Sequence, residues 1–273
     1  MLDSLEVEKM RGIAVKSSTL TLACRHPQRG SCLLNLIATP GHVDFGYEVS
    51  RSLKECQGAV LLVDALQGIQ AQTASNFYQA FCQNLTIVPG ANEVDLVSSQ
   101  HIVSDVKSQM RKMLDDAWCD DDILEVSAKT GFGCDTLLER ILDTIPPPKS
   151  DEPHLTFKGL LFDMFFHPIK GAVLLCTAKD GELRRRQKIA FGHASDVLTV
   201  SEAGILAPGM MPTDCLRAGQ VGYVGANVKN IRQFRVGDTI FAKNCAKLSK
   251  PFDGRLKVSS SPKPNVCRNA VSS

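Results

Sequence analysis

The sequence predicts an α/β fold, a mostly parallel sheet with helices on both faces, followed by a small β-barrel. Two observations predict it. In the first half of the chain, short apolar runs alternate with segments of helical periodicity, which is typical of the strand–helix units of a parallel sheet. After a run of three prolines the helices stop, and short apolar runs separated by glycine or proline turns continue, as in small barrels.

Five apolar runs in the first half are predicted strands. The first two flank a polar turn and predict a hairpin, and the third is a Val/Leu run that ends in an acid. Four segments with helical spacing complete the alternation. The predicted strands are Thr19–Cys24, Leu33–Ile37, Ala59–Asp64, Leu85–Pro89 and Ile123–Ser127, and the predicted helices are Tyr47–Cys56, Ala71–Cys82, Ser99–Met113 and Cys134–Thr144.

The prolines at 146–148 end the last helix and stiffen the chain that follows them. They predict an α/β domain over residues 1–145, a linker over 146–154, a β-barrel over 155–243 and a disordered or degenerate tail over 244–273. The segment Lys179–Glu182 is predicted to be an Asp-Gly hairpin turn. The predicted barrel strands are Phe157–Met164, Ala172–Ala178, Lys188–Phe191, Val221–Val224 and Asp238–Ala242.

Composition excludes several classes of function. The net charge of +2 over 273 residues is too small to predict nucleic-acid binding by bulk attraction. Ten cysteines without a Cys-x-x-Cys pair or neighbouring histidines predict free thiols in a reducing compartment, with neither a zinc site nor a disulfide framework. No apolar run approaches the roughly 20 residues of a membrane span, and the acidic N-terminus is not a recognisable targeting peptide.

The second predicted strand ends in a turn made of Thr39, Pro40, Gly41 and His42, at the sheet edge where α/β proteins hold phosphates. The stretch 39–45, with the segment 47–53 after it, closely resembles switch II of translational GTPases, and more narrowly of the LepA family (elongation factor 4 and its mitochondrial Guf counterpart). The resemblance implies that the Gly41 N–H approaches the γ-phosphate of GTP and that His42 acts in catalysis by orienting the attacking water. The alternative for His42 is a polar residue at the entry to a helix.

Two later segments are similar to the guanine-reading motifs of that family. Residues 88–95 follow a strand, as the Asn-Lys-x-Asp motif does, and the resemblance implies that Asp95 accepts the N–H groups of guanine while Asn92 ties the loops together. In isolation, an Asn-x-x-Asp loop is more often a simple turn. Ser127, Ala128 and Lys129 begin a match to the final guanine motif, in which the alanine N–H meets O6 of the base.

Three residues depart from the family at its motif positions. Ala14, within a segment that resembles switch I, stands where a threonine binds Mg²⁺, and Ala38 stands where an aspartate holds a Mg²⁺-bound water. Glu93 replaces the lysine that covers the base. The resemblance therefore implies GTP and Mg²⁺ as cofactors, while these residues predict impaired binding of both and no metal ligand in this chain.

The phosphate-binding pattern Gly-x-x-x-x-Gly-Lys-Ser/Thr does not occur in the sequence. In the family this loop follows a strand that lies in the middle of the sheet, between those matched by Leu33–Ile37 and Ala59–Asp64. The prediction is thus a P-loop-GTPase-like sheet that lacks its first strand and has an empty slot. Such an N-terminal domain would fold poorly alone, or a segment of it would be missing from this chain.

The resemblance covers about residues 1–243, and the segments 218–223 and 236–240 are similar to domain II of the family. It implies a translation factor GTPase that binds ribosomes in mitochondrial protein synthesis, acts in back-translocation or fidelity, and hydrolyses GTP to GDP and phosphate. It also implies contact between the barrel and the small ribosomal subunit, with Arg184–Arg186 and Lys188 as an rRNA-binding cluster or merely a solvated surface.

The implied location is the mitochondrial matrix side, with the cytoplasm as the alternative. The family's tRNA-reaching domain has no counterpart in these residues, and its inner-membrane association cannot be judged from them. The rival interpretation is a non-catalytic ribosome-interaction protein, or a relic or incomplete gene product without GTP hydrolysis. Whether this chain is an enzyme stays open at this point.

Overall fold

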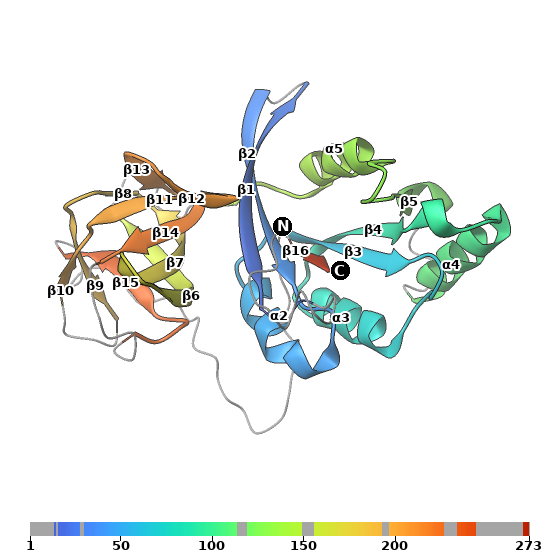
Figure 1. The fold of residues 1–273 in the computed structure, drawn as a ribbon, viewed down its shortest axis with the longest axis horizontal. Helices are drawn as coiled ribbons and strands as arrows, with labels where there is room; N and C mark the ends of the chain where they lie inside the picture. Colours follow the sequence, from blue (N-terminus) through green and yellow to red (C-terminus); the bar gives the residue numbers. More distant parts are fainter. Residues whose placement is uncertain are drawn as a thin grey trace.

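The structure is a computed structural model that describes residues 14, 16–27, 30–113, 119–148, 156–192, 197–226, 234–243 and 270–272; for residues 43, 51 and 270–272 it describes the backbone alone. Within these residues the chain forms two units that meet at the prolines 146–148 (Figure 1). One is a six-stranded sheet with helices and the other is a barrel-like set of antiparallel strands. This confirms the predicted fold class. No helix in the described part of the chain is both long and apolar enough to span a bilayer.

The sheet of the first unit has the strand order β1-β2-β16-β3-β4-β5. Its first two strands form the predicted antiparallel hairpin, and the remaining neighbours are parallel. Parallel strands here are rich in Val, Leu and Ile because both faces of the sheet are covered. The strands are β1 (Ser18–His26), β2 (Gly30–Thr39), β3 (Gly58–Asp64), β4 (Thr86–Asn92) and β5 (Leu124–Glu125).

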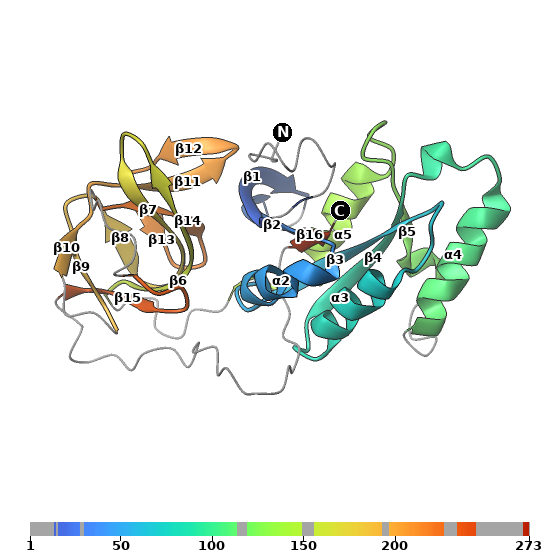
Figure 2. The ribbon, with the colours of Figure 1, turned by 60° about the horizontal axis from the view of Figure 1, so that its bottom comes forward.

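Helices cover both faces of this sheet, because successive side chains of β3 point to opposite faces and both sets need apolar partners. Ala59 packs in one cluster with α2 and α3, whereas Val60, the next residue, packs in another cluster with α5. Val63 packs with α4 on the same face as Ala59. Figure 2 shows α5 on the opposite side of the sheet from α2 and α3. The helices are α2 (Gly46–Leu53), α3 (Ala71–Phe81), α4 (Gln100–Met113) and α5 (Cys134–Thr144).

The slot between β2 and β3, predicted to be empty, contains the short strand β16 (Ala270–Ser272). It runs parallel to both neighbours, with Ala270 opposite Ile37 and Ala59. Residues 270–272 belong to the stretch predicted to be a disordered or degenerate tail, and the rest of that stretch, 244–269, lies outside the described residues, so the predicted tail stays a prediction. The physical reason for the pairing is that β2 and β3 would otherwise present unpaired backbone N–H and C=O groups.

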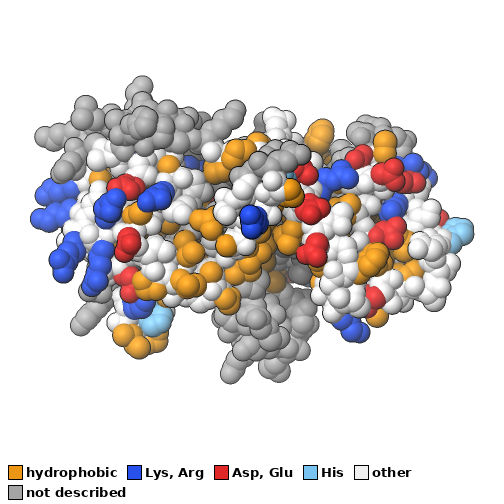
Figure 3. All heavy atoms as spheres, turned by 90° about the horizontal axis from the view of Figure 1, so that it is seen from above, with side chains coloured by type: hydrophobic (Ala, Val, Ile, Leu, Met, Phe, Trp, Pro, Cys, Tyr) orange, Lys and Arg blue, Asp and Glu red, His pale blue; other side chains and the backbone are white. Residues whose placement is uncertain are grey.

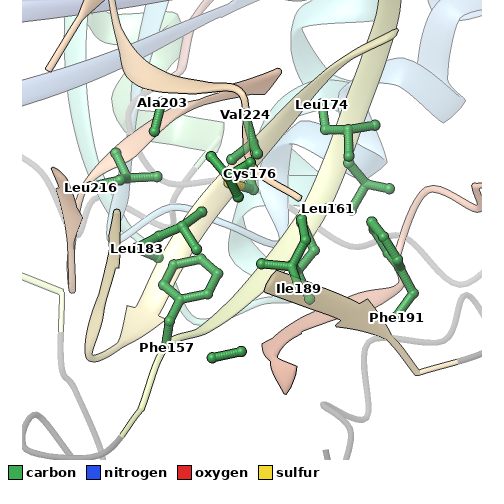
Figure 4. Packing of buried hydrophobic residues seen from close by; sticks show 14 of the residues in the cluster. Phe157, Leu161, Leu174, Cys176, Leu183, Ile189, Phe191, Ala203, Leu216 and Val224 are labelled. Carbon is green, nitrogen blue, oxygen red and sulfur yellow. The ribbon is translucent and has the colours of Figure 1, made fainter. Parts of the chain in front are cut away.

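The second unit is an eight-stranded antiparallel sheet and a two-stranded one around an apolar core, with a second apolar cluster that includes Val173 and Leu175. Leu161, Leu174, Cys176, Leu183 and Leu216 have no exposed surface and meet in this core (Figure 4). The larger sheet contains β6 (Lys158–His167), β7 (Gly171–Asp180), β9 (Lys188–Phe191), β10 (Val197–Thr199), β11 (Glu202–Ala207), β12 (Gly209–Pro212), β14 (Val221–Gly225) and β15 (Thr239–Ala242), and the smaller contains β8 (Glu182–Arg184) and β13 (Cys215–Arg217).

The prediction of a hairpin at Lys179–Glu182 is wrong, although the chain does turn there. Gly181 has a φ of +64°, which suits glycine, but β8 pairs with β13 and not with β7. Both edges of β7 are already taken by β6 and β14. The turn therefore carries the chain from one sheet into the other.

A polar cluster links the β6–β7 turn to β11 and β14. The Glu202 carboxylate accepts hydrogen bonds from the Lys170 ammonium and the Tyr223 hydroxyl. These hydrogen bonds hold the pKa of Glu202 below its usual value, and burial together with the same carboxylate raises the pKa of Tyr223.

Among the described residues, two ion pairs join the units. The side chain of Glu55 is 2% exposed and its carboxylate lies 2.9 Å from the Lys179 ammonium, and Lys16 lies 3.1 Å from Asp163. A cavity of about 390 Å³ lies beside the first pair, between β2, the end of α5 and strands β7 and β14. The sheet and the barrel therefore share a partly polar boundary.

Candidate nucleotide site

The predicted site residues lie on loops that leave one edge of the sheet. Parallel strands β3 and β4 end at this edge together with β2, and α/β proteins place their ligand sites at such carboxyl ends. The loops after β2, β4 and β5 carry the switch-like turn and the two guanine-type motifs. The fold thus brings segments far apart in the sequence to a common edge.

The turn after β2 is held by local hydrogen bonds. Thr39 and Pro40 are buried, so they anchor the turn and do not face a ligand. The Asn76 side chain of α3 donates to the Gly41 carbonyl at 3.2 Å. The Phe45 N–H donates to the His42 carbonyl at 3.0 Å, which closes a short 3₁₀ turn before α2. The position of Gly41 is therefore held by the hydrogen bond from α3 and by the hydrogen-bonded turn that follows it.

The His42 side chain is half exposed and is oriented by its neighbour in the turn. Its Nδ1 accepts the Asp44 backbone N–H at 3.3 Å and lies 3.4 Å from the Asp44 carboxylate. The ring centroid lies 6.1 Å from that of Phe45. This arrangement suits a polar residue at the entry to a helix. It also leaves the imidazole exposed to solvent at the edge of the sheet, where a water could reach it. The predicted role of His42 in orienting water therefore stays a prediction.

A cavity of about 380 Å³ opens at this edge, with Gly41, His42, Asp64, Asn92 and Glu93 in its lining. The Asp64 carboxylate is already used, because it accepts the N–H groups of the loop that follows β3, at 2.7 Å in the closest case. Glu93 adopts a left-handed backbone with φ of +64°. Both carboxylates bring negative charge to the place where the family resemblance would put phosphates.

The loops after β4 and β5 are tied to each other by side chains of the predicted guanine motifs. The Ser127 side chain is fully buried; its hydroxyl donates to the Asp95 carboxylate at 2.6 Å and accepts the Thr130 N–H at 3.2 Å. The Ala128 N–H donates to Asn92 Oδ1 at 3.3 Å. The structure therefore brings four of the predicted guanine-site residues together, and their role in binding stays a prediction.

These residues are divided between two neighbouring cavities. Asn92 lines the cavity that also contains Gly41 and His42, whereas Asp95 and Ser127 line a second cavity of about 450 Å³. Lys129 is exposed beside the loop and belongs to neither lining. The 92–95 loop is the wall between the two cavities.

The residues present do not fit a bound Mg²⁺. Ala14 lines the first cavity beside Gly41 and His42, and Ala38 lies within β2, opposite Ser18 of β1. Neither has a side-chain oxygen, and Mg²⁺ requires oxygen ligands. Within the ranges that the structure describes, no three His, Cys, Asp or Glu side chains gather as a metal cluster.

Sequence reasoning did not identify Asn76 or the bonding of Asp64. Asn76 lies in the middle of α3 without any motif around it, so nothing local indicates its contact with the turn. Asp64 was visible as an acid at a strand end, which is a usual signal for a loop-capping carboxylate. The Asn76 contact joins two elements that only the folded structure brings together, whereas the Asp64 bonds are local to the loop that follows β3.

Known proteins share both the sequence and the fold. Residues 1–147 match the family model of the elongation factor Tu GTP binding domain. Elongation factor 4 of Aquifex aeolicus (strain VF5) is 43% identical over 252 residues, which cover 92% of this chain and 41% of that protein. The mitochondrial translation factor GUF1 homolog of Ixodes scapularis is 46% identical over 245 residues, which cover 89% of this chain and 36% of that protein.

Solved structures agree with the fold. A bacterial selenocysteine-specific elongation factor, EF-Sec, superposes with a TM-score of 0.71 at 19% identity, over 89% of this chain and 40% of its own. Elongation factor SelB of Methanococcus maripaludis, in complex with the GTP analogue GPPNHP, gives a TM-score of 0.65 at 19% identity over 83% of this chain and 49% of its own.

The chain spans only 36–41% of the length of the two curated relatives described above. The similarity nevertheless runs through both the sheet and the barrel, and the family model covers the first unit except for β16. The chain therefore belongs to the translational GTPases that carry the elongation factor Tu GTP-binding domain, and among them to the elongation factor 4 family.

Proposed function

We propose that this chain is a ribosome-binding protein of the elongation factor 4 type that recognises the guanine base and is impaired in GTP hydrolysis. The observation that carries the proposal is the contrast between the two parts of the site. The guanine-type loops are tied together by Ser127 and Asn92, whereas positions 14 and 38 offer no oxygen to a metal.

Guanine recognition follows from the placement of Asp95. A carboxylate accepts the two N–H groups on one edge of guanine, and adenine does not offer the same pair. The bond from Ser127 uses one carboxylate oxygen of Asp95 and fixes its direction. The Ala128 N–H, which the resemblance assigns to O6 of the base, donates to Asn92 in this structure, so binding would exchange one acceptor for another.

Impaired hydrolysis follows from the charges around the first cavity. Phosphoryl transfer depends on Mg²⁺ and on positive groups to neutralise the charge on the γ-phosphate. Here Gly41 offers a backbone amide and His42 an imidazole, while Asp64 and Glu93 contribute negative charge to the same cavity. We therefore expect His42 to have no metal-bound phosphate against which to direct a water.

Ribosome binding is proposed to use the basic end of the barrel. Figure 3 shows Lys and Arg side chains gathered over the end of the molecule that carries the barrel. Arg184 is paired with Glu182 at 2.7 Å, and the Arg185 side chain donates to the Ser201 carbonyl at 2.9 Å. Arg186 and Lys188 are exposed, so these two are the proposed contacts to rRNA phosphates.

The proposed setting is mitochondrial protein synthesis, on the matrix side. The support is the mitochondrial designation of several GUF1 relatives at 43–46% identity. Bacterial elongation factor 4 proteins at similar identity support the cytoplasm as the alternative. Imaging of the tagged full-length protein distinguishes them, and staining of the cytosol alone would overturn the mitochondrial setting.

The test of the site is a titration of the purified chain with fluorescent GTP and GDP, with and without Mg²⁺. We expect saturable binding that excess ATP does not compete for, that EDTA does not abolish, and that is followed by no release of phosphate. Asp95→Ala should weaken binding at least about a hundredfold, the loss expected for two charge-assisted hydrogen bonds of about 1.5 kcal/mol or more each. Asp105→Ala, which removes an exposed carboxylate on α4, is the matched control and should bind as the wild type does.

Two outcomes contradict the proposal. The absence of binding up to millimolar nucleotide would remove guanine recognition and leave the barrel as the functional part. Steady Mg²⁺-dependent turnover would remove the claim of impairment. For the ribosome, an unchanged salt dependence of co-sedimentation after Arg186→Glu and Lys188→Glu would exclude the basic end of the barrel as the contact.

A further inference from the structure

Two cysteines face each other across the β1–β2 hairpin. In the register of the hairpin, Cys24 of β1 lies directly opposite Cys32 of β2. Both are free thiols, and both side chains are partly exposed. They lie near the turn that joins the two strands, where Figure 1 shows the hairpin extending beyond the neighbouring strands of the sheet. The hairpin therefore presents a pair of thiols that small molecules can reach.

The two thiols lie on the same face of the hairpin, because directly opposed residues of an antiparallel pair point to the same side. Cys24 packs with apolar residues that include Leu34 of β2 and Leu138 of α5. Leu34 follows Cys32 by two residues and so shares its face. Both sulfurs are thus on the side of the hairpin that is turned towards α5.

Opposed side chains of this hairpin come close enough to interact. On the other face, the Thr21 hydroxyl donates to Asn35 Oδ1 at 3.1 Å, and these two residues are also direct partners in the register. Burial and the nearby charge of Cys32 together raise the pKa of the Cys24 thiol above its usual value. Cys24 and Cys32 are therefore neighbours in space as well as in register.

The spacing of an antiparallel pair permits a disulfide with little movement. Directly opposed residues have Cα atoms about 4.5–5.5 Å apart, and a disulfide spans about 4.4–6.8 Å between Cα atoms. Their Cβ atoms are about 4.5–5.5 Å apart, whereas a disulfide needs about 3.5–4.5 Å, so the strands must draw together slightly. The Cys32 thiol would also give up a weak hydrogen bond to the Gly30 carbonyl at 3.6 Å. Both costs make such a bond easier to reduce than a relaxed one.

We propose that Cys24 and Cys32 are a site of reversible oxidation, at which thiol–disulfide exchange with a small-molecule disulfide such as oxidised glutathione links β1 to β2. One cysteine thiolate attacks a sulfur of the small disulfide, which gives a mixed disulfide and releases one small thiol. The other cysteine attacks the protein sulfur of the mixed disulfide and releases the second small thiol. Two electrons pass from the cysteines to the small disulfide, and the two cysteine protons end on the two released thiols.

The bond would fix the hairpin that lies between the two units. Strand β1 contacts β11 of the barrel, and β2 leads into the turn that begins after Thr39. The same end of the hairpin is already held against α5, because the side chain of His26 is 6% exposed and its Nε2 lies 2.9 Å from the Asp143 carboxylate. Oxidation would therefore act on strand pairing at the boundary of the units and not on nucleotide contacts, so the nucleotide titration does not bear on it.

The experiment is thiol mapping on the full-length chain in glutathione buffers of fixed ratio, with acid quenching and labelling by N-ethylmaleimide. Trypsin cuts the chain before and after each cysteine, so Cys24 falls in peptide 17–25 and Cys32 in peptide 30–51. In excess oxidised glutathione we expect these peptides to be linked, with the mass of their sum less two hydrogens. Excess reduced glutathione should restore both labels. Glutathione adducts or free thiols at both positions, without a linked peptide, would overturn the proposal.

The linkage must also depend on the folded hairpin. The ratio of linked to unlinked peptide at a given glutathione ratio should be at least about tenfold higher in the native chain than in concentrated urea, where only the short connecting chain holds the thiols together. Equal ratios in the two states would contradict the proposed role of the hairpin. Cys82→Ser removes an exposed thiol at the end of α3 and is the matched control, with unchanged linkage, whereas Cys32→Ser should abolish the linked peptide.

Discussion

Replacing Ser127 with alanine should separate the two guanine-type loops. The Ser127 hydroxyl is fully buried and makes two hydrogen bonds, one to the Asp95 carboxylate at 2.6 Å and one from the Thr130 N–H at 3.2 Å. A hydrogen bond to a charged group is worth about 1.5–3 kcal/mol and a neutral one about 0.5–1.5 kcal/mol. Because Asp95 and Thr130 are exposed and can bind water instead, the low end of each range applies. We expect a loss of about 2 kcal/mol in the free energy of unfolding.

The assay is urea unfolding followed by the ellipticity of the sheet and helices, with amide exchange at residues 128–130 as the local readout. Faster exchange at Thr130 and Ala128 should accompany the loss, since both amides belong to the network that Ser127 anchors. Ser98→Ala removes an exposed hydroxyl from the neighbouring loop and is the matched control, with an expected change within about 0.5 kcal/mol. A Ser127→Ala loss no larger than that of the control would refute the argument that this hydroxyl holds the loops together.

Three further outcomes follow from other parts of the structure. Gly133→Ala should cost about 3 kcal/mol or more in unfolding free energy, because a Cβ there would lie 2.0 Å from a backbone carbonyl oxygen at a φ of +70°; Gly131→Ala, with φ of +83° and open space around it, should cost about 1–2 kcal/mol in the same titration. The folded protein lowers the pKa of Glu202 from 4.5, so the ionised carboxylate stabilises the fold above that pH. This stabilisation is lost as the pH falls through the lower pKa of the folded state. The difference in unfolding free energy between wild type and Glu202→Gln should therefore shrink when unfolding is measured below about pH 4. Burial raises the pKa of the Cys176 thiol to about 12, so mass spectrometry after thiol labelling at pH 8 should find the exposed Cys119 modified and Cys176 unmodified, and modification of Cys176 in folded protein would contradict the packing of the barrel.

Elements with strong local patterns were predicted from the sequence close to their bounds. Strand β9 at Lys188–Phe191 and helix α5 at Cys134–Thr144 have the predicted limits. Strands β8 and β10–β13 were missed because three to six residues give too little alternation to distinguish them from loop. Strand β16 was missed for a different reason: Ala-Val-Ser carries no strong signal, and its pairing depends on strands far away in the sequence.

The features of the candidate site likewise divide into those that local pattern predicts and those that depend on tertiary contacts. The motifs identified Asn92, Asp95 and Ser127 because each lies at or just after the end of a predicted strand at the same sheet edge. The left-handed backbone of Glu93 and the bond from Ala128 to Asn92 were not predictable, because they arise where two loops from separate strands meet. Local pattern locates such residues, and tertiary contact decides which atoms they use.

The strand order of the sheet has a consequence for biosynthesis. Strands β2 and β3 are made early, while the strand between them comes from residues 270–272, after the whole barrel. At about 5–20 residues per second, the emerging chain would carry an incomplete sheet for on the order of ten seconds after β5 has been synthesised. During that time its two central strands expose backbone edges that can pair with other chains. This topology therefore predicts a period during synthesis in which a chaperone that covers the two edges would limit aggregation.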